Sequence, residues 1–380
     1  MNFKIKFLLS LFLLTGFFVN AQTGVTVVDS IYSNGIYRTY RLYRPTIYTG
    51  ATSVPLILNL HGYTSNSFQQ QIYGNFMPIA DTANFLVVHP QGTKDGSNQP
   101  YWNAGISTIG ANDLLFLSQL IDSLKATYNI DNNCVYSTGM SNGGFMSNYL
   151  ACNLSNKIAA IAGVTGTIFT NWFSSCNPGR PVPVMHIHGT ADPTVPYAGN
   201  STMIAADTLV KMWRVKNNCN SVPSFSNVPN INTTDGCTAE HYIYTGGNSG
   251  SSVEFYKIIG GGHTWPGAAF TTGVTNQDFN ASVQIWRFFR KYKLNMLTSV
   301  NEIANSRNNI IIFPNPTSDF IQIVSDEKLN YELFDVSGKR ISINEINANT
   351  IDISKLENGI YFLSLSNNSY KEVRKIVKVN

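Results

Sequence analysis

The sequence predicts an α/β protein with a mainly parallel sheet covered by helices, followed by a small all-β sandwich. Three observations support this prediction. Short apolar runs such as Val54–Leu60 and Val253–Ile259 alternate with stretches of helical periodicity such as residues 113–128. Alternation of this kind is typical of parallel sheets, whose strands are buried on both faces. Beyond residue 310, short strand-like runs are instead separated by turn residues.

The 380 residues divide into four segments. Residues 1–21 combine two lysines, a short apolar run and a small residue at the end, which predicts a signal peptide for export. The alternative is a membrane anchor, for which the run is short, and no later stretch predicts a membrane span. Residues 22–296 form the expected α/β domain, residues 297–309 a linker, and residues 310–380 the sandwich.

Local patterns predict the individual elements of the first domain. The two half-polar segments at its start suit antiparallel edge strands, and the fully apolar runs suit buried strands. The predicted edge strands span residues 25–31 and 37–43, the buried strands residues 54–60, 85–88, 134–138, 159–163, 183–187 and 253–259, and the helices residues 113–128 and 276–292.

The composition favours a secreted globular protein. Only 13% of the residues are charged, and the net charge is +4 without a basic cluster in the middle of the chain, so we expect no nucleic-acid partner. Export to an oxidising compartment favours disulfides. We predict the bridges Cys152–Cys176 and Cys219–Cys237, with Cys134 free, because each bridge then closes a local loop.

The most informative motif is Gly139-Met140-Ser141-Asn142-Gly143. A strand-like run precedes it and a helix-compatible stretch follows, which is the arrangement of a nucleophile elbow in α/β-hydrolases. Glycine at both ends of the motif lets the strand and the helix approach closely. The motif therefore predicts Ser141 as a nucleophile and the backbone amide of Asn142 as a donor to an oxyanion.

A serine nucleophile needs a histidine to take its proton and a carboxylate to orient that histidine. In α/β-hydrolases these residues follow in the order serine, acid, histidine. Asp192 and His263 each come after a predicted strand and satisfy that order, and no other histidine follows both partners at a strand end. Asp113 and Asp131 precede Ser141, so the order argues against either as the acid.

The loop after the first core strand is expected to complete the site. A backbone amide there, that of Tyr63, would join that of Asn142 in an oxyanion hole. Trp102 and Trp265 are candidates for the wall of a substrate pocket, the alternative being a place in the core. The sequence shows no metal-ligand spacing and no phosphate-binding glycine loop, so we expect neither a metal nor a cofactor.

Five motifs between residues 36 and 293 together resemble the poly(3-hydroxybutyrate) depolymerase/feruloyl esterase family of secreted α/β-hydrolases. They are LHG at 60–62, YWNA at 101–104, GMSNGG at 139–144, HGTAD at 188–192 and GHTWPG at 262–267. The resemblance implies an esterase for feruloyl, acetyl or polyhydroxyalkanoate-type esters, with Ser141, Asp192 and His263 as its triad. Some relatives carry a cysteine pair where this chain has Tyr63 and Tyr101, so that bridge is absent here.

Residues 310–380 resemble the C-terminal sorting domain of the type IX secretion system. The motifs are FPNP at 313–316, YELFDVSGK at 331–339 and LENGIYF at 356–362. The resemblance implies that the secretion machinery is a partner and that the protein is released or attached to the cell surface. A polymer- or sugar-binding β-module is the alternative, and the lack of a tryptophan strip argues against it.

Together these observations predict a secreted serine esterase. Two alternatives stay open. One is a serine peptidase of the prolyl-oligopeptidase type, which shares a similar elbow. The other is a non-catalytic surface-binding protein on a hydrolase scaffold. The sequence does not distinguish a soluble ester from a polymeric one.

Overall fold

The computed structural model contains two compact units, residues 1–298 and 299–380. It describes residues 24–107, 110–270, 272–297, 310–325, 328–347, 349–367 and 371–379. The predicted signal peptide and nearly all of the predicted linker lie outside these residues. Among the described residues, no helix combines the length and the apolar character that crossing a membrane requires.

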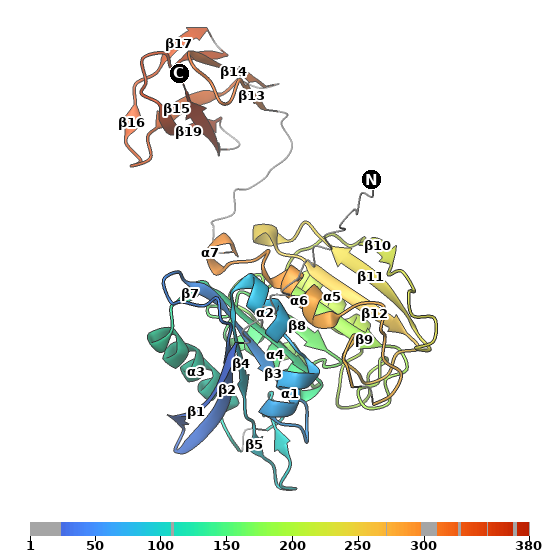
Figure 1. The fold of residues 1–380 in the computed structure, drawn as a ribbon. Helices are drawn as coiled ribbons and strands as arrows, with labels where there is room; N and C mark the ends of the chain where they lie inside the picture. Colours follow the sequence, from blue (N-terminus) through green and yellow to red (C-terminus); the bar gives the residue numbers. More distant parts are fainter. Residues whose placement is uncertain are drawn as a thin grey trace, which may run out of the picture. The chain divides into compact units, whose positions relative to one another are not determined.

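A ten-stranded sheet forms the centre of the first unit, in the order β1-β2-β4-β3-β7-β8-β9-β12-β11-β10 (Figure 1). Its six central strands pair in parallel, as the sequence predicts. Their side chains are almost all buried, which is why they appear in the sequence as continuous apolar runs. These strands are β4 (Leu86–Pro90), β3 (Val54–Leu60), β7 (Ile130–Met140), β8 (Ala160–Val164), β9 (Val184–Gly189) and β12 (Val253–Ile259).

Antiparallel strands flank the parallel centre on both sides. At one edge, β1 (Val25–Ser33) pairs with β2 (Ile36–Arg44), as predicted. At the other edge, β11 (Thr238–Tyr244) and β10 (Ser224–Asn227) extend the sheet beyond β12, which the sequence did not predict. A separate two-stranded ribbon, β5 (Thr93–Lys94) with β6 (Pro100–Tyr101), lies in the loop region after β4.

Helices cover both faces of this sheet and bury two apolar clusters. Side chains of α3, α4 and α5 belong to one cluster, and side chains of α2 and α6 belong to the other. The predicted helix at 276–292 begins only at residue 281, where the Asn280 side chain accepts a hydrogen bond from Val283 N. The helices are α1 (Ser67–Tyr73), α2 (Met77–Ala83), α3 (Asp113–Thr127), α4 (Asn142–Asn153), α5 (Ala206–Lys216), α6 (Ala281–Phe289) and α7 (Leu294–Leu297), with 3-10 turns η1 (Phe173–Ser175) and η2 (Asn248–Gly250).

The second unit consists of two antiparallel four-stranded sheets, in the orders β13-β14-β18-β17 and β16-β15-β19-β20. Inward-facing residues such as Ile321, Leu333, Ile351 and Leu363 form one common apolar core between them. The predicted all-β sandwich is therefore confirmed. Its strands are β13 (Ile311–Phe313), β14 (Phe320–Val324), β15 (Asn330–Phe334), β16 (Arg340–Ile341), β17 (Asn344–Asn347), β18 (Thr350–Asp352), β19 (Gly359–Ser366) and β20 (Lys371–Lys378).

Candidate active site

Ser141 occupies a strained turn between β7 and α4. Its backbone has φ 54° and ψ −122°, a conformation that non-glycine residues rarely adopt outside functional sites. The turn is closed by hydrogen bonds of 2.8 Å from Ser141 N to Val164 O and 3.0 Å from Phe145 N to Ser141 O. A Cβ atom at Gly143 would lie 2.1 Å from Leu60 O, so only glycine fits there. The structure thus shows the geometry of a nucleophile elbow.

Asp192 and His263 come together at the carboxyl ends of two neighbouring parallel strands, β9 and β12. The His263 Nδ1–H donates to Asp192 Oδ2 at 2.8 Å, and the amides of Thr194 and Val195 donate to Asp192 Oδ1 at 2.8 and 2.9 Å. Burial of Asp192 opposes its ionisation, but the hydrogen bond from His263 holds the pKa of the carboxyl below its ordinary value. The anionic Asp192 leaves His263 Nε2 free to accept a proton.

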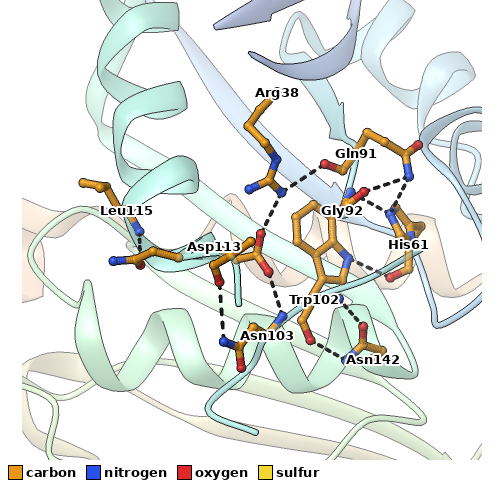
Figure 2. Close-up of polar contacts among 11 residues, drawn as sticks. Arg38, His61, Gln91, Gly92, Trp102, Asn103, Asp113, Leu115 and Asn142 are labelled. Carbon is orange, nitrogen blue, oxygen red and sulfur yellow. Dashed lines mark hydrogen bonds and ion pairs between the residues drawn. The ribbon is translucent and has the colours of Figure 1, made fainter. Parts of the chain in front are cut away.

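The loop after β3 is held in place by a buried imidazole, that of His61. Gly92 N–H donates to His61 Nε2 at 2.9 Å, so Nδ1 carries the proton and donates to the carbonyl oxygen of Gly62 at 2.7 Å. Burial lowers the pKa of His61 to about 4 and keeps the ring neutral. The Trp102 indole N–H also donates to His61 O, at 2.9 Å (Figure 2). The sequence placed His61 at this loop but did not reveal this positioning role.

The residue after Ser141 is fixed by a two-way contact. Trp102 N donates to Asn142 Oδ1 at 2.6 Å, and Asn142 Nδ2 donates back to Trp102 O at 3.0 Å (Figure 2). Neither the Tyr63 amide nor the Asn142 amide donates to another described residue. Both amides are therefore free to bind a ligand oxygen, as the expected oxyanion hole requires.

Behind Trp102 lies a buried ion pair that the sequence reasoning missed. Arg38 Nη2 donates to Asp113 Oδ1 at 2.7 Å and to Gln91 O at 3.2 Å, and Asn103 N donates to Asp113 Oδ2 at 2.7 Å (Figure 2). Removing one partner of such a pair leaves a buried charge, so the two side chains stay together. Through their bonds to Gln91 O and Asn103 N they constrain the backbone at residues 91 and 103. Asp113 is thus engaged in structure, which agrees with its exclusion as the acid.

Hydrogen bonds join the two segments that carry Tyr63 and Tyr101. Thr64 N donates to Pro100 O at 2.9 Å, and the Tyr63 hydroxyl donates to Asp95 Oδ2 at 2.8 Å. Together with the indole bond of Trp102, these contacts hold the mouth of the site without a disulfide.

Ser141 and His263 line a common cavity of about 530 Å³, which is within the usual range for small-molecule sites. Tyr63 borders it, and Phe68 and Ile72 of α1 supply apolar wall. The Ser141 hydroxyl makes no hydrogen bond to a described residue. Contacts between nucleophile and base are often long before substrate binds. No group of three or more His, Cys, Asp or Glu side chains is placed to hold a metal within the part of the chain that the structure describes.

Two segments of the chain match known families. Residues 108–229 match the phospholipase/carboxylesterase family, and residues 311–379 match the secretion system C-terminal sorting domain. The chain is a homologue of carboxylic ester hydrolases. The expected α/β-hydrolase fold, the resemblance to secreted esterases and the sorting domain are thereby confirmed.

Curated relatives of this esterase homologue act on different esters according to their names. The bifunctional acetylxylan esterase/xylanase of Neocallimastix patriciarum is 31% identical, over 63% of this chain and 33% of its own length. Feruloyl esterase B of Piromyces equi is 28% identical (58% and 41%), and poly(3-hydroxyalkanoate) depolymerase C of Paucimonas lemoignei is 27% identical (56% of both). The match thus spans about a third to about half of these relatives' length.

A solved acetyl xylan esterase from Aspergillus awamori is 16% identical, with a TM-score of 0.49 over 63% of this chain and 94% of that chain.

Two further histidines of the esterase homologue lie behind Asp192. His188 Nε2–H donates to Val195 O at 2.8 Å and lies 3.5 Å from Asp192 Oδ2, while His186 Nε2–H donates to His188 Nδ1 at 3.1 Å. Both rings are fully buried, and burial lowers the pKa of each. His188 thus fixes the loop that presents Asp192. The H-x-H pair that ends four residues before Asp192 is the sequence signal that could have indicated this positioning role.

Of the two alternatives for Trp102 and Trp265, pocket wall or core, the structure shows the core. Both side chains are buried, with exposed fractions of 0% and 1%, and neither lines a cavity at Ser141. Trp102 instead donates its indole N–H to His61 O and so holds the loop after β3. Trp265 donates its indole N–H to Ser282 Oγ at 3.1 Å and packs in the core beneath α6.

The cysteine prediction is half right. Cys152 and Cys176 form a disulfide, and Cys134 is free and buried. The bridge Cys219–Cys237 is wrong, since both cysteines are free and buried. Cys237 directly precedes β11, whereas the residue after Cys219 donates to the carbonyl of residue 245, beyond the other end of that strand. A seven-residue strand separates such positions by roughly 20 Å, far beyond disulfide reach.

Proposed function

We propose that this chain is a serine esterase that hydrolyses carboxylic esters through an acyl-enzyme on Ser141. The observation that carries the proposal is the 2.8 Å hydrogen bond between Asp192 and His263 beside the cavity that Ser141 and His263 share. The strained backbone of Ser141 and the two free amides of Tyr63 and Asn142 support the same reading.

In this mechanism His263 Nε2 takes the proton of Ser141 as the hydroxyl attacks the ester carbon. The carbonyl oxygen becomes an oxyanion and is bound by the amides of Tyr63 and Asn142. The bond to the alcohol oxygen then breaks, and His263 gives that oxygen its proton. Water next attacks the acyl-enzyme and gives a proton to His263, which passes it to Ser141 Oγ as the bond to the acyl group breaks and the acid leaves. Asp192 orients the imidazole and stabilises its charged form throughout.

Hydrolysis of p-nitrophenyl acetate and butyrate tests the proposal. We expect Ser141→Ala to lose roughly 10⁴–10⁶-fold in kcat, the usual effect of removing such a nucleophile. Ser226→Ala, an exposed serine on β10, is the matched control and should keep the wild-type rate. Equal rates for wild type and Ser141→Ala would refute the assignment.

For the substrate, we propose hydroxycinnamoyl or short-acyl esters of plant cell walls ahead of solid polyesters. The names of two of the three curated relatives, an acetylxylan esterase/xylanase and a feruloyl esterase, support this order. Methyl ferulate, acetylated xylan and polyhydroxybutyrate film should be compared side by side. Clearing of the film without release of ferulate or acetate would reverse the order.

For the sandwich unit, we propose that it directs export through the type IX secretion machinery and takes no part in the chemistry. The proposed catalytic residues and both amides all belong to the first unit. In a host with this machinery, deletion of residues 310–380 should leave active esterase in the periplasm. Loss of ester turnover in the purified truncated protein would contradict a purely sorting role.

A further inference from the structure

Two cavities meet at Ser141, and His263 lines only one of them. The histidine-side cavity, of about 530 Å³, has Ser141, Tyr63 and His263 in its lining. The asparagine-side cavity, of about 630 Å³, has Ser141, Tyr63 and Asn142 in its lining instead. An ester bound at Ser141 has two substituents, the acyl group and the alcohol, so each of them can occupy one cavity.

We propose that the alcohol occupies the histidine-side cavity and the acyl group the asparagine-side cavity. This assignment rests on the proposed esterase function. When the bond between the acyl carbon and the alcohol oxygen breaks, the electron pair stays on that oxygen, which takes the proton from His263. The alcohol oxygen therefore lies within hydrogen-bond reach of His263. The carbonyl oxygen faces the two amides, and the acyl group extends to the side that His263 does not line.

One wall of the asparagine-side cavity is apolar and suits a flat acyl group, while Lys94 and Asp95 also belong to its lining. Phe145, in the first turn of α4, stacks on Phe169 with ring centroids 4.3 Å apart and an interplanar angle of 24°. Val195 and Met203 complete this apolar wall. Backbone bonds from Ile204 N to Ile168 O and from Thr170 N to Thr202 O tie its two sides together at 3.0 and 2.9 Å. Such a wall is rigid and is expected to select acyl groups by size and shape.

The histidine-side cavity has an exposed apolar rim. Phe68, Ile72 and Phe270 line it with exposed fractions of 53%, 37% and 67%, so they form a rim in contact with solvent. Gln69 and Thr272 add polar groups to the same lining. Because this rim is in contact with solvent and carries both apolar and polar groups, the alcohol can extend past it, including a sugar hydroxyl of a larger molecule.

Two substitutions to tryptophan separate the cavities experimentally. Met203→Trp narrows the asparagine-side cavity, and Ile72→Trp narrows the histidine-side cavity. Ile231→Trp, on an exposed loop, is the matched control. Each protein is assayed with p-nitrophenyl acetate, butyrate and ferulate, which vary the acyl group, and with methyl, phenyl and naphthyl acetate, which vary the alcohol.

We expect Met203→Trp to lower kcat/KM for the ferulate ester relative to the acetate ester by at least about tenfold, the usual scale of steric discrimination in a pocket. Its relative rates across the alcohol series should stay within about threefold of wild type. Ile72→Trp should show the reverse pattern. If Met203→Trp does not fold, Met203→Ala should instead increase the preference for the ferulate ester.

The assignment would be overturned if Met203→Trp changed the alcohol series and Ile72→Trp the acyl series, or if both variants affected both series equally. Either result would leave the esterase function intact. A wild-type protein without Ser141-dependent turnover of any ester would overturn both. Activity of wild type on all six esters together with insensitivity to both substitutions would also overturn the assignment.

Discussion

The carboxylate of Asp192 is positioned by a neighbour that takes no part in proton transfer. His188 donates to the carbonyl of Val195, and the amide of Val195 donates to Asp192. The imidazole of His188 therefore closes the turn that carries the carboxylate. Because His186 donates to His188 Nδ1, it fixes the tautomer that makes this contact possible.

Replacing His188 by leucine should lower kcat by about 10- to 100-fold while leaving KM nearly unchanged. The substitution leaves Val195 O without a donor and loosens Asp192, so His263 is oriented less well. His188→Gln retains an N–H donor and should restore part of the loss. Steady-state kinetics with p-nitrophenyl butyrate measures both variants. An unchanged kcat in His188→Leu would show that the turn that carries Asp192 keeps its conformation without His188.

At this scale, the sequence indicated which residues chain order brings close together, and failed for residues whose place depends on burial. Ser141, Asp192 and His263 each follow a recognisable strand, and the structure places Asp192 against His263 and all three near one site. Trp102 and Trp265 look similar in the sequence to pocket residues. Only the packed structure shows that their rings point into the core.

At the scale of elements, the disulfide between Cys152 and Cys176 joins the end of α4 to the loop before β9. Helix α4 begins at the proposed nucleophile, and β9 ends ahead of the proposed acid. A cross-link that closes a loop of this length should stabilise the first unit by about 3 kcal/mol on the chain-entropy model.

The double variant Cys152→Ser/Cys176→Ser should therefore unfold at lower urea concentration than wild type under oxidising conditions. Under reducing conditions the two proteins should unfold alike. Urea titrations followed by tryptophan fluorescence report on this unit alone, since all five tryptophans lie between residues 102 and 286. An equal midpoint in oxidising buffer would contradict the predicted contribution.

The elements that the sequence predicted are those with buried faces. The central strands carry continuous apolar runs, and β3 and β12 begin and end at the predicted residues. Strand β10 is exposed along its whole length, so its pattern does not differ from that of a loop. Strand β11 is only half-buried, and its sequence shows no clear alternation of polar and apolar residues. Its extended conformation depends on antiparallel pairing with β12.

For the whole molecule, buried histidines predict a loss of stability in mild acid. Burial lowers the pKa of His61 to about 4 and that of His89 to about 3, and it also lowers the pKa of His186 and His188. In the unfolded chain each imidazole titrates near 6.5. Between pH 6.5 and about 4 the unfolded chain therefore binds protons that the folded protein does not.

The contribution of these groups to the free energy of unfolding should thus be complete above pH 6.5. It should decrease as the pH falls below that value. Each histidine adds up to about 1.4 kcal/mol per pH unit to this slope. His89 is the simplest test because its ring is fully buried. Urea titrations between pH 7.5 and 4.5 should give a shallower slope for His89→Leu, by about one proton. An identical slope would contradict the account.

The most direct test of the central claim is the covalent intermediate itself. The protein is mixed with p-nitrophenyl butyrate, quenched in acid within milliseconds and examined by mass spectrometry of the intact chain and its peptides. We predict one butyryl group per chain, on the peptide that contains Ser141, and none in Ser141→Ala. A butyryl group on another residue, or wild-type ester turnover at saturating substrate without any acylated Ser141, would contradict the account.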